Sequence, residues 1–166
     1  MVAAGPETAE VWSWLKEIAD PEVPVLSIVD LGIVRDVKWT EDDELVVEIT
    51  PTYSGCPALE AIASDIRSSI QQHGIDRLRL ETRLSPAWTT DWLSDDAKDR
   101  LREFGIAPPS RLIRVGEIGA AREARVKCPR CGSENIELIS RFGSTACKAL
   151  YKCRSCLEPF DAFKRH

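Results

Sequence analysis

The chain has 166 residues, of which 43% are hydrophobic and 30% charged, with a formal net charge of −5. This composition is typical of a soluble globular protein and excludes the fibrous and disordered classes. The sequence lacks a run of about 18 uncharged apolar residues and a basic signal region at its acidic start, so we expect a cytoplasmic protein without a membrane partner.

The first part of the chain predicts a helix followed by a hairpin. A helix over residues 6–19 is indicated by Pro6 in the first turn and by apolar residues at helical spacing. The two prolines of residues 20–24 end it. Two runs rich in β-branched residues, 32–39 and 45–49, are separated by a polar turn, which predicts a β-hairpin.

A strongly amphipathic helix comes next, beginning at Pro57 and ending near His73 and Gly74. Its apolar stripe consists of Leu59, Ile62, Ile66 and Ile70. Apolar and charged residues alternate over 78–83, which predicts a half-exposed strand. A last helix is predicted over residues 94–105, because its first residue is a capping serine, two aspartates follow, and a glycine closes it.

This order predicts an α/β (α+β) domain with the sequence α-β-β-α-β-α over residues 1–109. The prolines at the end of this range mark a domain boundary. Residues 110–127 are interpreted as a linker, although they also fit a strand. Residues 128–166 then form a small β domain, so we expect two domains of unequal size.

Four of the six cysteines form two Cys-x-x-Cys pairs, Cys128 with Cys131 and Cys153 with Cys156. In a reducing compartment this spacing indicates a metal site rather than disulfides. We interpret it as a structural zinc ribbon, because four thiolates around Zn²⁺ make a closed tetrahedral site. A rubredoxin-like iron site and a transient iron–sulfur cluster are the alternatives.

A domain this short buries little core, so its metal would supply folding free energy. We expect a small apolar layer around the metal, formed by Ile136, Leu138, Ile139, Phe142, Leu150, Tyr151, Phe160 and Phe163.

The other two cysteines lie outside this pattern. Cys56 is placed at the start of the second helix, where backbone N–H groups and the helix dipole lower the pKa of a thiol and favour the thiolate that binds iron or attacks electrophiles. The alternative is a small apolar residue that fills the turn. Cys147 is interpreted as a free thiol, with metal exchange as the alternative. Asp20, Glu22 and Asp30 flank turns, and we interpret them as turn-forming residues.

The sequence offers little that indicates catalysis. His73 and His166 are the only histidines, and neither a glycine-rich phosphate loop nor a Glu-x-x-His pair is present. Trp88 and Trp92 are interpreted as packing residues, with an exposed aromatic platform as the alternative. We therefore expect no catalytic site in this chain.

Several short motifs nevertheless resemble those of known families. The SufT-like metal–sulfur cluster assembly factors are similar to this chain at residues 20–24 (DPEVP), 30–34 (DLGIV) and 50–57 (TPTYSGCP). The D-type (also called J-type) subunits of the bacterial phenylacetyl-CoA epoxidase are similar at residues 85–92 (SPAWTTDW), 105–109 (GIAPP) and 142–151 (FGSTACKALY), and in the four-cysteine ribbon. This second resemblance spans the chain from about residue 8 to residue 164.

The resemblance implies an accessory subunit of a multicomponent di-iron oxygenase in aerobic phenylacetate breakdown. It would help to mature or maintain the di-iron or iron–sulfur centres, with the oxygenase or the reductase component as its partner; a homodimer stays open. Cys56 corresponds to the family's reactive thiol and would hold iron or a cluster transiently, with Asp20, Glu22, Thr50 and Thr52 around it. The alternative is a docking subunit whose Cys56 is only structural.

The distribution of charge favours a protein partner over nucleic acid. Residues 1–109 carry 10 Lys and Arg against 21 Asp and Glu, a formal charge of −11, whereas residues 110–166 carry 12 against 6, a charge of +6. Four thiolates around Zn²⁺ lower the charge of this tail further, and the acidic body repels phosphate. We therefore expect no nucleic-acid partner.

Overall fold

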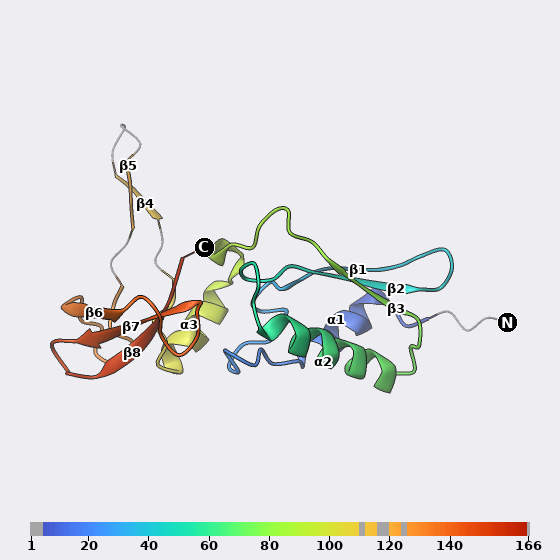
Figure 1. The fold of residues 1–166 in the computed structure, drawn as a ribbon, viewed down its shortest axis with the longest axis horizontal. Helices are drawn as coiled ribbons and strands as arrows, with labels where there is room; N and C mark the ends of the chain where they lie inside the picture. Colours follow the sequence, from blue (N-terminus) through green and yellow to red (C-terminus); the bar gives the residue numbers. More distant parts are fainter. Residues whose placement is uncertain (1–4, 110–111, 116–119, 124–125, 166) are drawn as a thin grey trace. The chain divides into compact units, whose positions relative to one another are not determined.

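A computed structural model describes residues 5–109, 112–115, 120–123 and 126–165 of the protein (Figure 1). The chain forms two compact units, Met1–Ser94 and Asp95–His166. Both units combine helices or turns with small sheets, which confirms the predicted α/β (α+β) class. Among the described residues, no helix combines the length and the apolar character needed to span a membrane.

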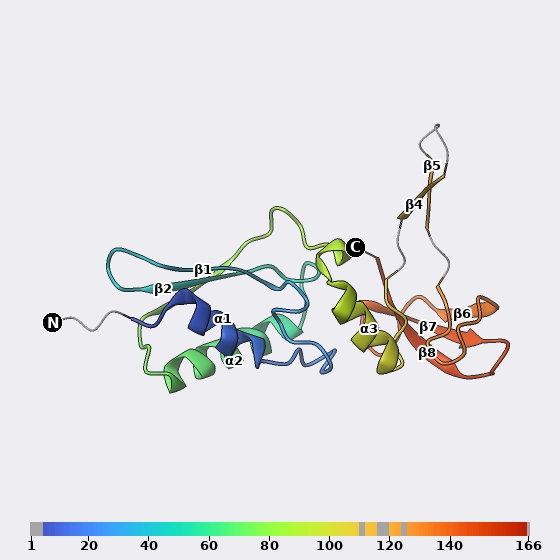
Figure 2. The same ribbon diagram turned by 180° about the vertical axis from the view of Figure 1, so that it is seen from behind.

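The first unit is built around a three-stranded sheet. Its elements are α1 (Thr8–Lys16), β1 (Val34–Trp39), β2 (Leu45–Ile49), α2 (Ala58–Gln72), β3 (Leu78–Thr82) and the short 3-10 helix η1 (Thr90–Trp92). The sheet has the order β1-β2-β3, in which β2 pairs antiparallel with β1 and parallel with β3. Both α1 and α2 lie on one face of this sheet (Figures 1 and 2).

The core of this unit lies between that face and the helices. It includes Leu45, Val47 and Ile49 of β2 and Ile62, Ile66 and Ile70 of α2, all of which are buried. The residues of β2 alternate because successive side chains point to opposite faces, and those of α2 recur every fourth position on one helical face. Gly74, with a φ of +82°, ends α2 as predicted, because glycine adopts the left-handed conformation without strain.

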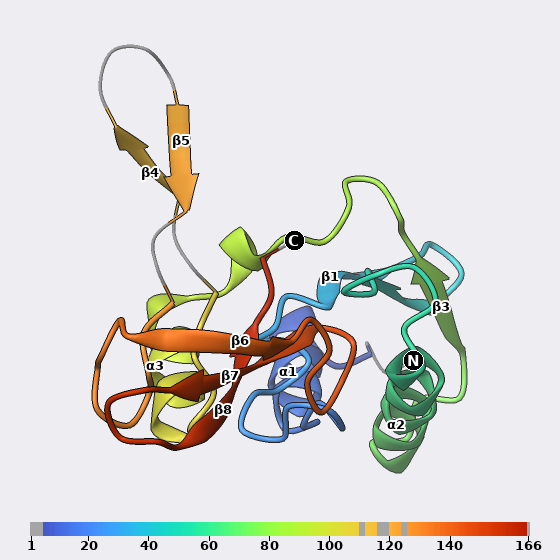
Figure 3. The same cartoon turned by 60° about the vertical axis from the view of Figure 1, so that its left-hand side comes forward.

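The second unit contains one helix and two small sheets. Its elements are α3 (Asp95–Glu103), β4 (Leu112–Val115), β5 (Ala120–Glu123), β6 (Ile136–Ser140), β7 (Lys148–Cys153) and β8 (Pro159–Phe163). The strands β4 and β5 form an antiparallel pair, and the ribbon sheet has the antiparallel order β6-β7-β8 (Figure 3).

The segment that follows α3 pairs with the ribbon sheet. The N–H of Ala107 donates to the carbonyl of Asp161 at 2.9 Å, and the carbonyl of Ala107 accepts from Phe163 at 2.8 Å. Ala107 therefore lies along the outer edge of β8, and α3 belongs to the second compact unit. The sequence instead predicts a domain boundary at residue 109, because the prolines there indicate a linker while this pairing involves residues far along the chain.

Candidate metal centre and thiol loop

The two Cys-x-x-Cys pairs bring four sulfur atoms together in the second unit. The Sγ atoms of Cys128, Cys131, Cys153 and Cys156 all lie within 4.8 Å of one another. The Sγ atoms of Cys131 and Cys153 are 3.5 Å apart, and those of Cys128 and Cys156 are 3.7 Å apart. Each of these distances joins one Cys-x-x-Cys turn, or knuckle, to the other. All four cysteines are free of disulfides.

This donor set fits a tetrahedral metal ion. Four thiolates at about 2.3 Å from a zinc ion lie about 3.8 Å from one another, which is close to the separations between the knuckles. Cys128 and Cys153 are buried, whereas Cys131 is exposed. Soft thiolate ligands favour Zn²⁺ or iron over Mg²⁺ and Ca²⁺. The four cysteines therefore satisfy both the geometry and the chemistry of a closed thiolate site.

The two knuckles share one backbone arrangement. In the first, the N–H of Cys128 donates to the carbonyl of Ser133, and in the second, the N–H of Cys153 donates to the carbonyl of Glu158, both at 2.9 Å. The N–H of Cys156 also donates to the sulfur of Cys153 at 3.4 Å, and this bond lowers the pKa of Cys153 to about 6. The two knuckles therefore present their sulfur atoms from matching turns, and the N–H of Cys156 favours the thiolate form of Cys153.

The apolar layer around this site is smaller than predicted. The ribbon core contains Ala107, Cys128, Cys153, Phe160 and Ala162, with Val126, Ile136, Tyr151 and Cys156 packed against it. Phe163 is also buried. In contrast, Leu138, Ile139 and Phe142 are exposed, so their assignment to the layer is wrong. They lie on or just after the edge strand β6, and the sequence pattern gives no indication that one edge of the sheet is uncovered.

Cys147 lies apart from the four-cysteine cluster. It is buried, and its sulfur lies 3.0 Å from the hydroxyl oxygen of Thr145. It is not a member of the group of sulfur atoms that surrounds the metal position. The interpretation of Cys147 as a cysteine outside the metal chemistry stays a prediction, with metal exchange as its alternative.

In the first unit, Cys56 occupies the turn that leads into α2. Its N–H donates to the carbonyl of Tyr53, and its own carbonyl accepts from Leu59 in the first helical turn, both at 3.2 Å. Pro57 has helical dihedral angles (φ −67°, ψ −23°), and Gly55 has a φ of +83°. Cys56 is partly exposed, and within the described residues its sulfur makes no hydrogen bond. The structure therefore presents a partly exposed cysteine at a helix start.

The acidic motif residues form turns, in agreement with their interpretation from the sequence. One carboxylate oxygen of the buried Asp20 accepts from the N–H groups of Glu22 and Val23, at 2.9 and 2.7 Å. Asp30 and Ser27 exchange two bonds between side chain and main chain, at 3.1 and 3.0 Å. These contacts fix the backbone of the loop between α1 and β1.

That loop is tied to the strand that leads to Cys56. The N–H of the buried Thr50 donates to the carbonyl of Ile33 at 2.8 Å, and the N–H of Ile33 donates to the carbonyl of Ile28 at 2.9 Å. Thr52 is partly buried and follows two residues later. The structure thus joins the loop of Asp20 to the end of β2 at Thr50 through backbone bonds, and Cys56 follows six residues later along the chain. The placement of these side chains around the sulfur of Cys56 stays a prediction.

A second segment, which sequence reasoning left without a role, holds the same loop from the other side. The indole N–H of the buried Trp88 donates to the carbonyl of Leu31 at 2.8 Å. The ring of Trp92 lies under the guanidinium of Arg35, 3.6 Å from its carbon, and against Gly32. Both tryptophans therefore pack, as predicted, and they support the turn between Asp30 and Val34. In the sequence, the Asp-Leu-Gly motif indicates a turn at residues 30–32. It does not indicate that the two tryptophans pack against this turn, because they lie more than fifty residues further along the chain.

The sequence matches that of a known protein over nearly the whole chain. A protein of Escherichia coli (strain K12), named "Putative 1,2-phenylacetyl-CoA epoxidase" with the letter D for its subunit type, is 50% identical over 161 residues, which cover 97% of this chain and 94% of that protein. The chain belongs to the family of D-type epoxidase subunits. Residues 115–164 of this family member match the model of the PaaD zinc beta ribbon domain, which contains all four clustered cysteines.

The first unit of this D-type protein has relatives of its own. Residues 8–74 match the model of an iron-sulfur cluster assembly protein, and this range includes Asp20, Thr50 and Cys56. An Fe-S protein maturation auxiliary factor of Porphyromonas gingivalis (strain ATCC BAA-308 / W83) is 31% identical over 84 residues, which cover 50% of this chain and 79% of the relative.

The fold of the first unit is shared with a solved structure. A domain of unknown function, DUF59, from Bacillus anthracis is 28% identical, with a TM-score of 0.52, and the match covers 56% of this chain and 89% of that domain. The D-type protein therefore combines an assembly-factor fold with a zinc-ribbon region, as the resemblance of its motifs implies.

Proposed function

We propose that this D-type protein helps to load or maintain the di-iron or iron–sulfur centres of a phenylacetyl-CoA epoxidase, and that it has no catalytic site of its own. The observation that carries the proposal is the partly exposed Cys56, which lies inside the segment matched by the assembly-protein model. The name of the relative that covers nearly the whole chain supports the epoxidase as the recipient.

In this proposal the Cys56 thiol loses its proton and binds iron, or one iron of a cluster, as cargo. The partial exposure of Cys56 lets a recipient protein approach the cargo, and a single protein ligand allows the cargo to be released. The hydrogen bonds of Asp20 and of the Thr50 backbone fix the loop between α1 and β1 beside the end of β2. In this proposal Glu22 and Thr52 are the other residues that surround the cargo. The ribbon cysteines hold zinc, which supplies folding free energy to the second unit and no redox chemistry.

Metal loading of the recipient tests this proposal. We would produce the oxygenase and reductase components of the epoxidase together with the full-length wild-type chain or with Cys56→Ser, purify the components, and measure their iron content. Cys56→Ser should lower iron loading severalfold while the zinc content of the chain itself stays unchanged. Cys147→Ser, which changes the other cysteine outside the cluster, should load normally and is the matched control.

Full loading by Cys56→Ser would contradict the proposal. It would favour the alternative that this chain is a docking subunit whose Cys56 only fills a turn. Binding of the variant to the components, measured in the same preparations, separates the two interpretations, because a carrier without its thiol still docks.

A further inference from the structure

The ribbon presents apolar side chains that neither the metal site nor the thiol loop uses. Leu138, Ile139 and Phe142 are 47%, 52% and 68% exposed, and they lie in one short stretch from β6 into the loop that follows. Large apolar side chains that gather on the surface of a small domain mark an interaction surface. We call these three residues, with the free edge of β6, the β6 surface.

The main chain of β6 is also available to a partner. At the opposite edge of the sheet, Ala107 pairs with β8, whereas no described residue pairs with the outer edge of β6. Arg154 donates to the carbonyl of Asn135, which makes the neighbouring pair of Ile136 and Cys153 a non-hydrogen-bonded pair. Because such pairs alternate, the N–H and carbonyl of Leu138 point away from β7. The register shifts between Leu138 and Ser140, and the N–H of Ile136 already donates to the carbonyl of Glu134 at 3.0 Å, so the open part of this edge is centred on Leu138. An outward main chain beside exposed apolar side chains is a template for a short added strand.

The loop after β6 holds Phe142 in this exposed position. Gly143 donates its N–H to the carbonyl of Lys148 at 2.8 Å, and the hydroxyl of Ser144 donates to the carboxylate of Asp161 at 2.6 Å. The ammonium of Lys164 lies 4.4 Å from the centre of the Phe142 ring. The loop is therefore fixed to the sheet, so that docking on Phe142 costs little conformational entropy.

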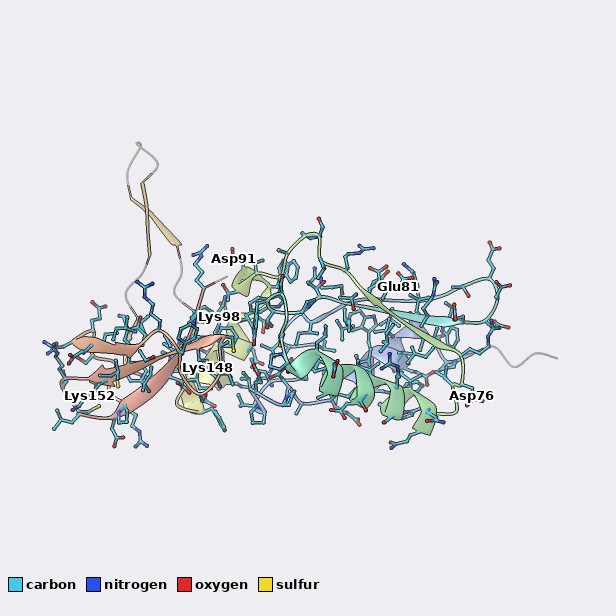
Figure 4. All side chains as sticks on the ribbon, in the orientation of Figure 1. Asp76, Glu81, Asp91, Lys98, Lys148 and Lys152 are labelled. Atoms are coloured by element: carbon cyan, nitrogen blue, oxygen red, sulfur yellow. The ribbon has the colours of Figure 1, made fainter. Side chains whose placement is uncertain are left out.

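The charges around this surface select an acidic partner. Glu137 of β6 pairs with Arg154 at 3.3 Å, which neutralises the acidic side chain of the strand. Arg141, which follows β6, and Lys152 of β7, which is labelled in Figure 4, make no ion pair within the described part of the chain. Lys152 lies opposite Glu137 in the register of β6 and β7, so its side chain is on the other face of the sheet from that of Leu138. Unpaired positive charge on the strand next to β6 and just after β6 attracts a segment that carries carboxylates.

We propose that β6 accepts an extended segment of a partner protein as a fourth strand of the ribbon sheet, with apolar side chains of that segment against the β6 surface and acidic side chains near Arg141 and Lys152. The partner is a component of the epoxidase, and this choice of partner rests on the proposed function. A second copy of this chain is the competing occupant, and the experiment distinguishes the two.

The sharpest test compares two changes at one residue. Leu138→Ala removes the side chain, whereas Leu138→Pro also removes the outward N–H and leaves the bonds between β6 and β7 intact, because proline is tolerated at the free side of an edge strand. With the full-length, zinc-loaded chain, we expect Leu138→Pro to bind the purified oxygenase or reductase component roughly tenfold more weakly than Leu138→Ala. Equal binding of the two variants would overturn strand addition.

A second pair of variants tests the side chains. Phe142→Ser should weaken binding of the same component roughly tenfold, whereas Leu84→Ser, which changes a residue of similar exposure (64%) in the first unit, should bind normally. Zinc content confirms that each variant retains its ribbon. Normal binding by Phe142→Ser would overturn the proposal, because the β6 surface would then not be a docking site. If sedimentation shows that the wild type is a dimer and that Leu138→Pro dissociates it, the occupant of β6 is a second copy of this chain and the proposal is overturned.

Iron loading separates this inference from the proposed function. If the component binds all variants equally while Cys56→Ser fails to load it, the proposed function stands and the β6 surface is wrong. If Leu138→Pro abolishes binding while Cys56→Ser loads fully, the surface stands and the carrier role of Cys56 is wrong. A component that binds neither the wild type nor any variant contradicts both.

Discussion

At the scale of single residues, the second knuckle departs from the usual choice of amino acid. Gly132, which follows the first Cys-x-x-Cys pair, has a φ of +72°, and Leu157, at the same place in the second pair, has a φ of +67°. The matching backbone bonds of Cys128 and Cys153 show that both knuckles need this left-handed conformation. Glycine adopts it freely, whereas the Cβ of a leucine collides with its own backbone. The leucine side chain is 67% exposed, so burial does not offset the strain.

We therefore expect Leu157→Gly to raise the free energy of unfolding of the zinc-loaded ribbon by about 1 kcal/mol. Leu157→Ala is the matched control, because it removes the same side chain but keeps a Cβ, and it should not be stabilised. Amide hydrogen exchange in β7 and β8 measures the change for this unit alone. Equal protection in the two variants would contradict the strain argument.

At the scale of elements, strands and helices with a clear hydrophobic period could be predicted from the sequence. The neighbours that cover each element could not. The strand β2 and the ends of α2 agree with the sequence pattern, because a period and a terminating glycine are local signals. The helix α1 is shorter than the predicted 6–19, and β8 was not predicted, because its five residues become a strand only beside β7 and Ala107. The exposure of Leu138 was missed for the same reason: periodicity defines two faces but not which neighbour covers them.

The sheet of the first unit also has a charged face, which the sequence did not indicate. Glu48 of the central strand is only 1% exposed, and its carboxylate lies 2.6 Å from the ammonium of Lys38 and 2.9 Å from the guanidinium of Arg83. The hydrogen bond from Lys38, assisted by the charge of Arg83, lowers the pKa of Glu48 despite the opposing effect of burial. Both partners are half exposed; Lys38 belongs to β1, and Arg83 comes directly after β3.

This ion-pair cluster predicts a loss of stability in acid. Because the pKa of Glu48 is lower in the folded than in the unfolded chain, its contribution is complete above the ordinary glutamate pKa and disappears as the pH falls below about 4. Glu48→Gln should therefore unfold more easily at neutral pH and lose less further stability in acid than the wild type. Denaturant unfolding measured by tryptophan fluorescence tests this. Glu81→Gln, which changes a half-exposed partner of Arg79, should retain the wild-type pH profile.

At the scale of the whole molecule, two units with different sources of stability share one chain. The first has an apolar core between a sheet and two helices, whereas the core of the ribbon consists largely of small residues and its own cysteines. The sequence predicted this contrast from the clustering of cysteines, but it placed α3 with the first unit, because the pairing of Ala107 with β8 leaves no local signal.

Removal of the metal should therefore unfold only the second unit. All five tryptophans (Trp12, Trp14, Trp39, Trp88 and Trp92) belong to the first unit, so their fluorescence reports on it alone. We expect a strong chelator to abolish hydrogen-exchange protection in β6, β7 and β8 while tryptophan fluorescence stays unchanged, because structural thiolate sites supply the folding free energy of small domains. A ribbon that stays protected without metal would contradict this expectation.

The parallel pairing of β2 with β3 also determines when the thiol loop is completed. The hairpin of β1 and β2 closes a short turn, in about 1–10 μs for such units, whereas Leu45 meets Leu78 only after the intervening helix has formed and folded back. Cys56 lies in that intervening segment, and Trp88 follows it along the chain. During synthesis, Cys56 is therefore translated before Trp88, whose segment packs against the loop between α1 and β1. We expect the Cys56 thiol to react most readily with oxidants or with unintended metal ions in that interval.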